Sequence, residues 1–542
     1  MAAASAVGRA DLATAAASSA NGIIPLDPKR DRLVIVASSL GTVFEWYDFF
    51  LYGILASLLG RLFFTTGNPT TELLFSLFAF AIGFFFRPLG AVIFGHFGDR
   101  IGRKYTFLVT IALMGGATAA IGLLPTYADI GVWAPVMLLL LRMLQGLALG
   151  GEYGGAAIYV AEHAPPGKRG MYTSWIQVSV PTGFLLCLVV VLTCRHTMTA
   201  EQFEAWGWRV PFLISLVMLA ISIYVRMKLS ESPVFQAMKA AGTTSKNPIV
   251  ESFSDRANVK MVLVALFGVA AGLTVVYYTS QFGTLYFLQG TARIPEEEAL
   301  LYMAVGALLA APLYVGFGWL SDIFGRKKLL LIGYALSAAL VFPLFHLMAD
   351  GANPALGEAT RSSPVTVELP RCDYNVFVKP ADDCSRALDF LTKRGISYVK
   401  QDSTALALTV GEQRITGFDK AAYTAALVAA GYPDKADPAR KSPWKIILGI
   451  ATMVALSAMT YGQVAAIMVE LFPAKIRYTS MSIPYHIGTG YFGGFLPFIS
   501  QYIVVTTGDA YSGLWYTVGV VVMAFFVSWI WLPETKDRDI TL

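Results

Sequence analysis

The chain has 542 residues, of which 56% are apolar and only 14% are charged, and its mean hydropathy is +0.58. Soluble domains carry about 25% charged residues, so this composition excludes an ordinary water-soluble globular protein. The formal net charge of +5 is small for this length and gives no support to a nucleic-acid partner.

Apolar runs recur along the whole chain, and many approach the ~20 residues that a helix needs to cross a bilayer. They predict an all-α membrane protein with twelve transmembrane helices in two groups of six. The first group is expected near 33–60, 72–96, 105–126, 133–161, 172–194 and 208–228. The second group is expected near 259–290, 299–319, 327–348, 443–471, 479–505 and 511–532.

The remaining segments are polar and divide the chain. Residues 1–32 predict a flexible cytoplasmic tail and not a signal peptide, because Asp11 interrupts them and no apolar core follows a basic start. The expected units are the tail 1–32, the N-terminal half 33–228, a cytoplasmic linker 229–258, helices 7–9 at 259–348, an insert at 350–442, helices 10–12 at 443–532 and a cytoplasmic tail at 533–542. Lys and Arg gather in the loops that this layout places in the cytoplasm, which puts both termini inside and the insert outside.

The insert at 350–442 lies between helices 9 and 10. It contains short β-like runs, VTVEL, YNVFV, ISYVK and ALALTV, and two helix-like stretches, ADDCSRALDFLTKRG and DKAAYTAALVAAG. A small α/β domain of marginal size is expected. Cys372 and Cys384 would form a disulfide in an oxidising space outside the cytoplasm, and two unpaired thiols are the alternative. Such a domain would bind solute, dock a partner or cover the outer mouth, and these alternatives stay open.

One charged motif occurs twice in the chain. GHFGDRIGRK, residues 95–104, falls between helices 2 and 3, and GWLSDIFGRK, residues 318–327, falls between helices 8 and 9. These are equivalent positions in two halves that each begin and end inside. The halves are therefore expected to be parallel repeats related by an axis along the membrane normal.

At this motif the chain resembles the major facilitator superfamily. The matching residues are Gly95, Gly98, Asp99, Arg100, Gly102, Arg103 and Lys104 in the first copy, and Gly318, Ser321, Asp322, Gly325, Arg326 and Lys327 in the second. Ile323 departs from the first copy, which has an arginine there. The resemblance implies a conformational latch that holds the inner side shut, made of Gly95, Asp99, Arg103, Lys104, Asp322, Gly325, Arg326 and Lys327. The alternative is that the basic residues only orient the protein in the membrane.

Further stretches resemble the metabolite–proton symporter family. They are GTVFEWYDFFLYG, FFFRPLGAVIFGHFGDR, RMLQGLALGGEYGGAAIYVAEHAPPGKRG and VELFPAKIRYTSMSIPYHIG. Members of that family transport 2-oxoglutarate, shikimate, citrate, and proline or betaine. The insert departs from the family's pattern, so the resemblance supports the fold more strongly than the solute.

Charged residues inside the apolar runs are expected to pair or to function, because each costs at least about 2.5 kcal/mol at the bilayer centre. Glu45 and Asp48 lie three apart on one helical face, and such a carboxylate pair is suited to proton coupling. Arg142 is the obvious cation for them, and the family resemblance places a functional arginine there. We expect the carboxylates to bind Arg142 when deprotonated and to release it on protonation. A permanent structural ion pair is the alternative. Glu152 is a further candidate, for proton transfer or for conformational pairing.

The expected substrate contacts are Arg87, Gln145, Tyr277 and Gln281. Arg87 would bind a carboxylate with both arms of its guanidinium, although related transporters of zwitterions also carry its RPLG element. Tyr277 and Gln281 are four apart and would share a helical face. A hydrogen bond to a neighbouring helix is the alternative for each of these residues.

Several other polar residues inside the apolar runs are weaker candidates, namely Gln177, Tyr278, Gln463 and His486. Bonds between helices are favoured for the first three. His486 is a secondary proton site, for which a packed and hydrogen-bonded histidine is the favoured interpretation.

No signature of an enzyme, a metal site or a cofactor stands out. GLALGGEYGG lacks the GK[ST] of a phosphate-binding loop, and no paired Cys or His spacing predicts a metal. We therefore expect a protein that is not an enzyme and has no cofactor, driven by an ion gradient.

Together these features predict a proton-coupled symporter of the bacterial inner membrane that imports a small organic acid by alternating access. A di- or tricarboxylate, 2-oxoglutarate or a shikimate-like compound is expected, and the partners would be solute, protons and the lipid bilayer, with a monomer as the working unit. Proline or betaine uptake is the alternative within transport, disfavoured because the chain stops soon after WLPETKDRDITL. A receptor that senses ligand through the insert without transporting it is the alternative of another class, and a membrane enzyme is a distant third.

Overall fold

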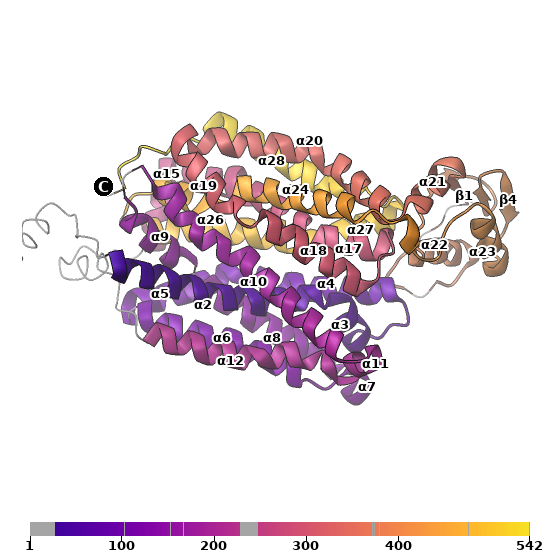
Figure 1. Ribbon diagram of the computed structural model, residues 1–542, viewed down its shortest axis with the longest axis horizontal. Helices are drawn as coiled ribbons and strands as arrows, with labels where there is room; N and C mark the ends of the chain where they lie inside the picture. The colour runs from indigo at the N-terminus through magenta and orange to yellow at the C-terminus, as the bar shows by residue number, and fades with distance from the viewer. Residues whose placement is uncertain are drawn as a thin grey trace, which may run out of the picture.

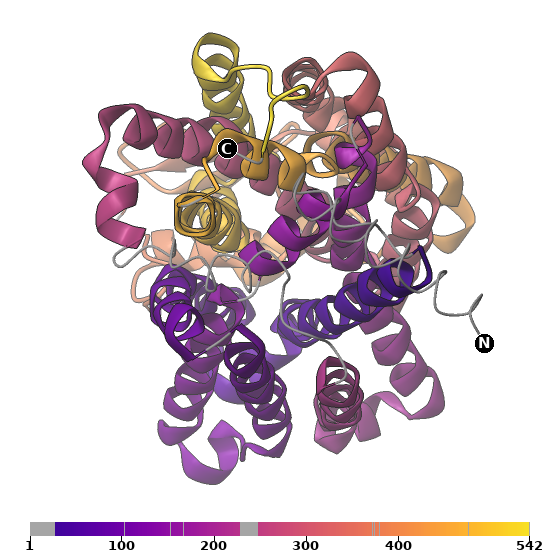
Figure 2. The same cartoon turned by 90° about the vertical axis from the view of Figure 1, so that its left-hand side faces the viewer.

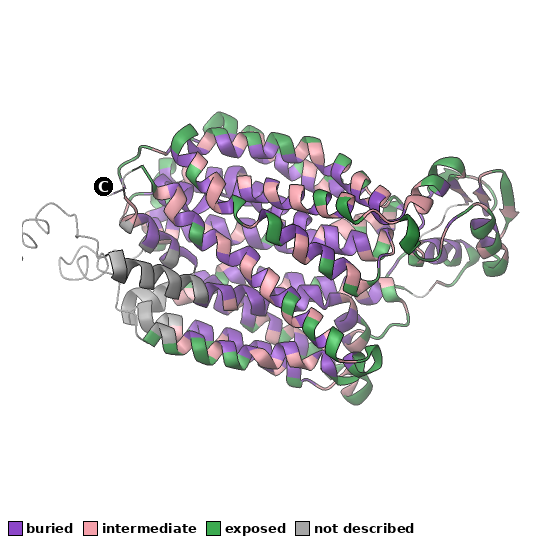
Figure 3. Cartoon of the chain, viewed as in Figure 1, coloured by how far each residue is buried: buried purple, intermediate pink, exposed green. Residues whose placement is uncertain are grey.

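The computed structural model describes residues 28–101, 103–151, 153–165, 167–227, 248–370, 372, 374–378, 380–474 and 476–540. Two helical groups lie side by side, and a small α/β unit lies at one end of them (Figure 1). Figure 2 looks along the long axis from the end opposite the α/β unit, with most of the first group below and most of the second above. Buried residues fill the inside of both groups, and exposed residues lie on the outer surface and on the α/β unit (Figure 3).

The first group contains the helices that precede residue 228. They are α2 (Pro28–Ile54), α3 (Ala56–Phe63), α4 (Pro69–Phe85), α5 (Arg87–Ile101), α6 (Arg103–Leu123), α7 (Tyr127–Ile130), α8 (Trp133–Gly150), α9 (Tyr153–His163), α10 (Arg169–Thr197), α11 (Ala200–Gln202), the π-helix η1 (Phe203–Gly207) and α12 (Arg209–Met227).

The second group is assembled from two stretches of chain on either side of the α/β unit. The first stretch has α14 (Pro248–Ser254), α15 (Arg256–Leu263), η2 (Val264–Ala270), α16 (Ala271–Tyr278), η3 (Thr279–Gly283), α17 (Thr284–Tyr286), η4 (Phe287–Thr291), α18 (Glu296–Ala310), α19 (Leu313–Phe324) and α20 (Arg326–Ala352). The second has α24 (Pro443–Tyr461), α25 (Val464–Leu471), α26 (Arg477–Ile487), η6 (Gly488–Gly494), α27 (Leu496–Thr507) and α28 (Leu514–Trp531). Here η2, η3, η4 and η6 are π-helical turns.

Within the described residues, eight helices are long and apolar enough to cross a membrane, and ten if two strongly bent pairs each count as one span. The bent pairs are Gly41–Ile54 with Ala56–Phe63, at 61°, and Ala200–Gly207 with Arg209–Tyr224, at 54°. The predicted helical fold in two groups agrees with this result. Of the twelve predicted spans, those at α6 and at α26–α27 fall outside the ten.

Glycines let α8 cross close to α4 and α5. A Cβ atom at Gly146 would collide with the backbone of Gly83, and one at Gly150 would collide with the backbone of Arg87. Gly146 and Gly150 are four apart and so form one smooth stripe on α8, the small-residue pattern that membrane helices use for tight contact. This crossing places Arg87 and Arg142 on neighbouring helices.

The α/β unit contains a four-stranded sheet in the order β2–β1–β3–β4. The strands are β1 (Val365–Leu369), β2 (Val399–Asp402), β3 (Ala407–Val410) and β4 (Gln413–Thr416), and the helices are α21 (Pro354–Ser362), α22 (Asp383–Lys393), α23 (Lys420–Ala429) and the short η5 (Pro438–Arg440). β1 pairs with β2 in parallel and with β3 in the antiparallel sense, and β3 pairs with β4 in the antiparallel sense. In register, Thr366 lies opposite Val399, Val365 opposite Val410, and Ala407 opposite Thr416.

This unit has a hydrophobic core of its own. Alternate residues of β1 are buried, and Val367 packs in a cluster with Leu388, Leu408 and Tyr423 that is separate from the core of the bundle. The helices α22 and α23 form where the sequence predicts them, and each begins at an aspartate whose side chain caps the first turn. A disulfide joins Cys372 to Cys384 at the start of α22, with an S–S distance of 2.04 Å.

One β-like run of the insert is not a strand. Tyr374–Val378, the YNVFV sequence, forms irregular structure, and β4 at Gln413–Thr416 takes a place in the sheet that the sequence analysis did not predict. Val376 instead packs with Leu74 and Val505 of the bundle. The apolar residues of this run therefore attach the insert to the helices. An alternating apolar pattern is the same whether its residues pack in the core of a sheet or against neighbouring helices.

Candidate functional site

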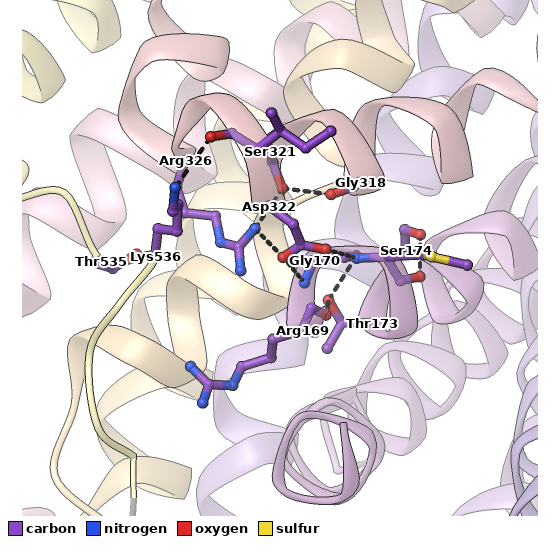
Figure 4. Close-up of polar contacts among 12 residues, drawn as sticks. Arg169, Gly170, Thr173, Ser174, Gly318, Ser321, Asp322, Arg326, Thr535 and Lys536 are labelled. Carbon is purple, nitrogen blue, oxygen red and sulfur yellow. Dashed lines mark hydrogen bonds and ion pairs between the residues drawn. The ribbon is translucent and has the colours of Figure 1, made fainter. Parts of the chain in front are cut away.

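A carboxylate of α19 joins the two helical groups at the end away from the insert. Asp322 Oδ1 accepts a hydrogen bond from the backbone N–H of Gly170, and Oδ2 accepts one from Met171, each at 2.8 Å (Figure 4). These amides belong to the first turn of α10, whose unpaired N–H groups and helix dipole favour an anion. Asp322 therefore ties the second group to a helix terminus of the first.

Arg326, at the start of α20, holds this carboxylate in place. Its Nη1 donates to Asp322 Oδ1 and to Ser321 Oγ, both at 2.7 Å (Figure 4). Its Nη2 lies 3.2 Å from Glu470 Oε1 of α25. The three charged side chains are at most 4% exposed. Buried charges persist only when they are paired and hydrogen-bonded, and this guanidinium pairs two carboxylates at once.

Two further ion pairs cross between the groups at the same end. Arg169 Nη1 lies 2.9 Å from Glu470 Oε1, and Arg477 Nη1 lies 2.9 Å from Glu162 Oε1. Arg169 and Glu162 belong to the first group, whereas Glu470 and Arg477 belong to the second. Separating the groups here would expose four largely buried charges to water or leave them without a partner.

The sequence analysis missed these pairings, although the sequence holds a signal for them. Glu162 and Glu470 each begin a Glu-x-x-Pro-x-x-x-Arg stretch, EHAPPGKR and ELFPAKIR, at equivalent points of the two halves. An acid and a base at one spacing in both repeats indicate that these four residues share a role, and the structure pairs each acid with the base of the other repeat.

The chain beyond α28 packs on this network. Glu534 accepts hydrogen bonds from the backbone N–H groups of Arg326 and Lys327, and Lys327 Nζ donates to Trp529 O at 2.8 Å. Thr535 Oγ1 donates to Glu470 Oε2 at 2.7 Å. Gly325 has φ = 100°, and a Cβ atom there would lie 2.5 Å from Glu534 Oε2, so both the turn and the contact require glycine.

Among the predicted latch residues, Asp322, Gly325, Arg326 and Lys327 thus lie in this network. The side chains of the first copy, Gly95, Asp99, Arg103 and Lys104, lie outside the described residues, as does Glu152. Glu45 is described and is buried.

Arg142 and Asp48, both buried, are joined through other side chains and not directly. Arg142 Nη1 donates to Gln145 Oε1 at 2.7 Å, and Gln145 Nε2 donates to Thr118 Oγ1 at 2.7 Å. The Thr118 side chain lies beside the Asp48 carboxyl, whose Oδ1 accepts from Ser215 Oγ at 2.5 Å. The predicted ion pair between Asp48 and Arg142 is therefore not formed in this conformation.

Two contacts explain why Arg142 does not reach the carboxyl. Gln145 lies three residues further along α8, and its Oε1 accepts the hydrogen bond from Arg142 Nη1. Gln145, a predicted substrate contact, therefore acts here as a positioning residue for Arg142. The guanidinium carbon also lies 4.5–4.6 Å from the ring centres of Phe49 and Tyr52, where aromatic faces stabilise the cation.

Arg87 is a second buried arginine, and its surroundings are different. α4 ends at Phe85 and α5 begins at Arg87, because Pro88 has no N–H to donate to the preceding turn. The Arg87 side chain is 1% exposed, and neither Nε nor Nη1 has a hydrogen-bond partner among the described residues. Its guanidinium carbon lies 5.2 Å from the ring centre of Phe84. These two nitrogens therefore do not make the hydrogen bond to a neighbouring helix that was the alternative role for Arg87.

The groups that face Arg87 come from the second helical group. Its charge acts on Tyr278, Tyr461, Tyr485 and His486. Tyr461 and Tyr485 share a hydrogen bond of 2.6 Å between their hydroxyls. The Tyr278 hydroxyl and both ring nitrogens of His486 have no hydrogen-bond partner within the described part of the chain. The hydrogen bond that the favoured interpretation of His486 requires is not formed among the described residues, and this histidine belongs to a set of polar groups without a partner there.

Tyr277 and Gln281 add to that set. The Tyr277 hydroxyl and both amide atoms of Gln281 are buried, again with no partner among the residues described. The π-helical η3 begins at Thr279, between them, so the α-helical spacing that predicts a shared face does not hold here. π-helical turns are frequent at functional sites. By contrast, Gln177 Nε2 donates to Tyr153 Oη at 2.7 Å, which is the predicted bond between helices.

Aromatic residues close the two groups against each other between this set and the insert. Tyr286 Oη donates to Gly53 O at 2.7 Å, and the Phe282 ring lies 5.7 Å from Phe50 and 5.2 Å from Phe80, centre to centre. A side chain at Gly53 would collide with the Phe282 ring. The unpartnered polar groups therefore lie between an aromatic closure at one end and the charge network at the other.

Within the described residues, one group of potential metal ligands comes together, Cys372, Asp382 and Cys384. Both of its sulfur atoms are joined in the disulfide, so they are not available as thiolate ligands.

Comparisons with known proteins agree with this arrangement. The chain matches the family described as sugar (and other) transporter over residues 33–261 and 420–542. It is 39% identical over 328 residues to the inner membrane metabolite transport protein YhjE of Escherichia coli (strain K12), which covers 60% of this chain and 74% of that protein. It is 39% identical over 326 residues to the shikimate transporter of the same strain, covering 59% and 73%. It is 36% identical over 333 residues to the proline/betaine transporter of Salmonella typhimurium, covering 60% and 66%.

The fold is also found among solved structures. The proton:xylose symporter XylE, solved with 6-bromo-6-deoxy-D-glucose, superimposes with a TM-score of 0.61 over 95% of this chain and 98% of its own, at 15% identity. Two helical groups, closed against each other at both ends around buried polar residues, define a transporter of the major facilitator superfamily. Within that superfamily, the chain belongs to the sugar (and other) transporter family, whose members are transporters and not enzymes.

Proposed function

We propose that this protein is a proton-coupled symporter that imports a small organic acid across a bacterial inner membrane by alternating access. One observation carries the choice of an acid. Arg87 is a buried guanidinium at the interface between the helical groups, and it has no carboxylate partner among the described residues. A buried charge without a counter-ion costs several kcal/mol, and a carboxylate solute would supply the missing partner.

The groups around Arg87 suit such a solute. A guanidinium binds a carboxylate with two parallel hydrogen bonds, which fixes the orientation of the solute as well as its charge. Tyr278, Tyr485 and His486 present hydroxyl and imidazole groups from the opposite side, which would bind hydroxyl or further carboxyl groups of the solute. The relative described as a shikimate transporter supports an acid that also carries hydroxyl groups.

The proposed topology has twelve spans, in which α6 and α26–α27 join the ten apolar spans already described. The end that holds Arg169 and Arg477 would face the cytoplasm, because basic loops remain on that side. The insert would then face the periplasm, where its disulfide is stable.

In this topology the structure corresponds to a state closed at both ends. Opening the inner end would separate Arg169 from Glu470 and Arg477 from Glu162, and would withdraw Asp322 from the α10 terminus. Opening the outer end would separate Tyr286 from Gly53. The two halves would rock about the solute site near Arg87, so that only one end opens at a time.

Asp48 is the proposed proton-binding group, with Glu45 beside it on α2. The Asp48 carboxyl is connected through Thr118 and Gln145 to Arg142. A proton on the carboxyl would turn an acceptor into a donor and reorder this chain of hydrogen bonds. Proton binding at Asp48 would thereby change the hydrogen bonds of Gln145 and Arg142 on α8, the helix that crosses α5 at Arg87.

Uptake of proline or betaine is the alternative solute class, and one observation favours it. The Tyr277 ring lies 5.5 Å from Tyr278 and 5.6 Å from Tyr461, and aromatic faces bind quaternary ammonium groups. A betaine would place its ammonium on these rings and its carboxylate on Arg87. The proline/betaine relative supports this alternative.

Proton movement in liposomes tests the proposal. Purified protein is reconstituted with a pH-sensitive dye inside, and shikimate, 2-oxoglutarate, citrate, glycine betaine and proline are added outside in turn. We expect one of the acids to drive protons inward, Arg87→Gln to abolish this flux, and Arg87→Lys to lower it at least tenfold, because lysine cannot make the bidentate contact. Arg386→Lys, on the exposed face of α22, is the matched control and should leave the flux unchanged.

Two results would contradict the proposal. Full proton-coupled uptake of an acid by Arg87→Gln would exclude Arg87 as the solute contact. Binding of a solute to the whole protein without any flux would favour a receptor that does not transport, a role for which the contact of the insert with both helical groups would be suited.

A further inference from the structure

A cavity lies beneath the insert, at the end of the bundle opposite the charge network. It has a volume of about 280 Å³, and its lining comes from three parts of the chain. Ser57 and Thr70 belong to the first helical group, Gln289 and Gln501 to the second, and Tyr398 to the insert. The hydrogen bond from Tyr286 to Gly53 and the Phe282 ring separate this cavity from Arg87.

The insert is fixed over this cavity by contacts with both helical groups. At the start of α4, the N-cap residue Asn68 donates from Nδ2 to Asp389 Oδ1 at 2.9 Å, and Thr71 Oγ1 donates to the carbonyl of Val376 at 2.5 Å. At the end of α27, the backbone N–H of Tyr398 donates to Gly508 O at 3.0 Å. The cavity is therefore a built space, held from two sides, and not a gap between loops.

Polar side chains of the insert and of the second helical group line this cavity. Tyr398 Oη and Thr392 Oγ1 lie beside each other, and Gln289 Nε2 is buried with no hydrogen-bond partner among the residues described. The Tyr398 side chain is only 5% exposed. Buried polar groups in native proteins are normally hydrogen-bonded, so the Gln289 amide is free to bind a ligand in this cavity, and the adjoining Tyr398 and Thr392 hydroxyls can turn toward the same ligand.

The charges around the cavity favour an anion. Arg61 and Lys393 line it, and no aspartate or glutamate does. The carboxylates that pair with these cations, Glu204 and Asp389, lie outside the lining. Close by, Lys400 donates to a backbone carbonyl, Thr506 O, and burial lowers the pKa of its ammonium group, which an anion nearby would oppose.

We propose that this cavity is a second binding site, in the outer entrance, for a small organic anion that carries a carboxylate and at least one hydroxyl group. The carboxylate would lie toward Lys393 and Arg61, and the hydroxyl toward Tyr398 and Gln289. The proposal goes beyond the transport function and does not depend on Arg87. Because the lining comes from both helical groups and the insert, opening the outer end would dismantle the site, so the bound anion stabilises the state closed to the outside.

Equilibrium dialysis of the full-length protein in lipid nanodiscs tests this site. Radiolabelled shikimate and 2-oxoglutarate are the probes, and glycine betaine is the zwitterionic comparison. We expect the wild-type protein to bind two molecules of one of the two acids per chain. Tyr398→Phe and Gln289→Leu should each weaken one of these sites about tenfold, because a hydrogen bond to a ligand is lost. Both substitutions nearly keep the volume of the side chain and break no hydrogen bond within a helix or strand, so folding should be retained.

Two control variants make the result specific. Lys420→Gln removes an exposed lysine on α23, away from the cavity, and should leave both sites unchanged. Arg87→Gln should remove the inner site and leave one acid bound per chain. Acid binding that neither Tyr398→Phe nor Gln289→Leu weakens overturns the outer site whatever the wild-type count, as does the absence of any acid binding. Equal binding of glycine betaine at the outer site overturns its preference for an anion. Retained uptake by Arg87→Gln contradicts the proposed function alone.

Discussion

Arg169 of the first helical group lies 2.9 Å from Glu470 of the second, and Arg477 of the second lies at the same distance from Glu162 of the first. Each half contributes one acid and one base at the same spacing, and each acid pairs with the base of the other half. Because both pairs lie at one end of the molecule, closing that end forms both and opening it breaks both. The two ion pairs therefore link the two halves at this end.

Neutralising Glu470 should weaken the closure of the inner end. Glu470 accepts from Arg169, Arg326 and Thr535, so Glu470→Gln leaves two largely buried guanidinium groups without their full counter-charge. Loss of one partner from a buried pair typically costs about 3–5 kcal/mol, here from the closed state. We expect a cysteine at Ser174, buried where α10 crosses α19, to react with a maleimide at least tenfold faster in Glu470→Gln.

The matched control for this experiment is Glu368→Gln, which removes a carboxylate on the surface of the insert. It should leave the labelling of Ser174→Cys unchanged. The native Cys187 and Cys194 are buried, and their reaction is measured in the parent protein. Equal labelling rates in Glu470→Gln and in the parent would show that Glu470 does not hold the inner end closed.

The chain from Asp48 to Arg142 gives a prediction about coupling. Asp48→Asn keeps the shape of the side chain but removes its exchange of a proton, so exchange of solute between the two sides should persist while accumulation driven by a pH gradient is lost. Ser215→Ala removes only the hydrogen bond to Asp48 and should lower accumulation about fivefold without abolishing it. Both activities are measured in the same liposomes, and full accumulation by Asp48→Asn would remove this residue from the coupling mechanism.

Sequence features that repeat or alternate were good predictors of the fold. The doubled motif around Asp99 and Asp322 indicated two related halves, and the helical patterns in the insert located α22 and α23. The failure at Tyr374–Val378 has a physical reason, because alternating apolar residues also suit a segment that packs on two surfaces. Val376 contacts Leu74 and Val505, which are distant in sequence, and no local pattern contains that information.

The candidate site was predicted in its residues more than in its contacts. Arg87, Asp48 and Arg142 were singled out because charges in apolar helices are costly. Which atoms these side chains contact depends on how the helices cross. Here the Arg142 guanidinium, which was expected to bind a carboxylate, donates to Gln145 instead. Likewise, the π-helical turn after Tyr278 shifts the helical phase, which a regular spacing of 3.6 residues does not anticipate.

The insert offers a prediction on pH. Arg414 Nη2 lies 2.6 Å from Glu368 Oε2, and its hydrogen bond holds the pKa of the Glu368 carboxyl below the ordinary value. A lowered pKa in the folded state means that the stabilisation is fully present above the unfolded pKa of about 4.3 and is lost as the pH falls through the lowered value. In Arg414→Met we expect the carboxyl to titrate closer to 4.3.

Carboxyl NMR of glutamate-labelled protein, recorded at pH values on both sides of the unperturbed glutamate pKa of about 4.3, would follow this titration. Both side chains are partly exposed, so the effect on the stability of the insert should be small and should decrease at high salt. Arg386→Met, which removes a comparable arginine from α22, is the control and should leave the Glu368 titration in place. Identical Glu368 curves in the wild type and in Arg414→Met would contradict the assigned cause.

The insert should move with the second helical group when the outer end opens. Its chain continues directly into α20 and α24, and it bonds to α27 through Lys400 and Tyr398. Among the described residues, its hydrogen bonds to the first group come from the first turn of α4 and its N-cap, such as Asn68 with Asp389. A cysteine pair at Asn68 and Asp389, joined by a short bismethanethiosulfonate crosslinker, should therefore lower uptake more than tenfold. A pair at Lys400 and Thr506, joined in the same way, links the insert to the group with which it already moves and should leave most of the uptake.

Reversal by a reductant provides the internal check on this comparison. The reductant also reaches the native disulfide of Cys372 and Cys384, so its effect on the wild-type protein is measured in parallel. If both crosslinked pairs stop uptake to the same extent, the insert moves independently of both groups. If neither does, the contacts with α4 survive the transport cycle, and the outer cavity cannot be dismantled by opening in the way we propose.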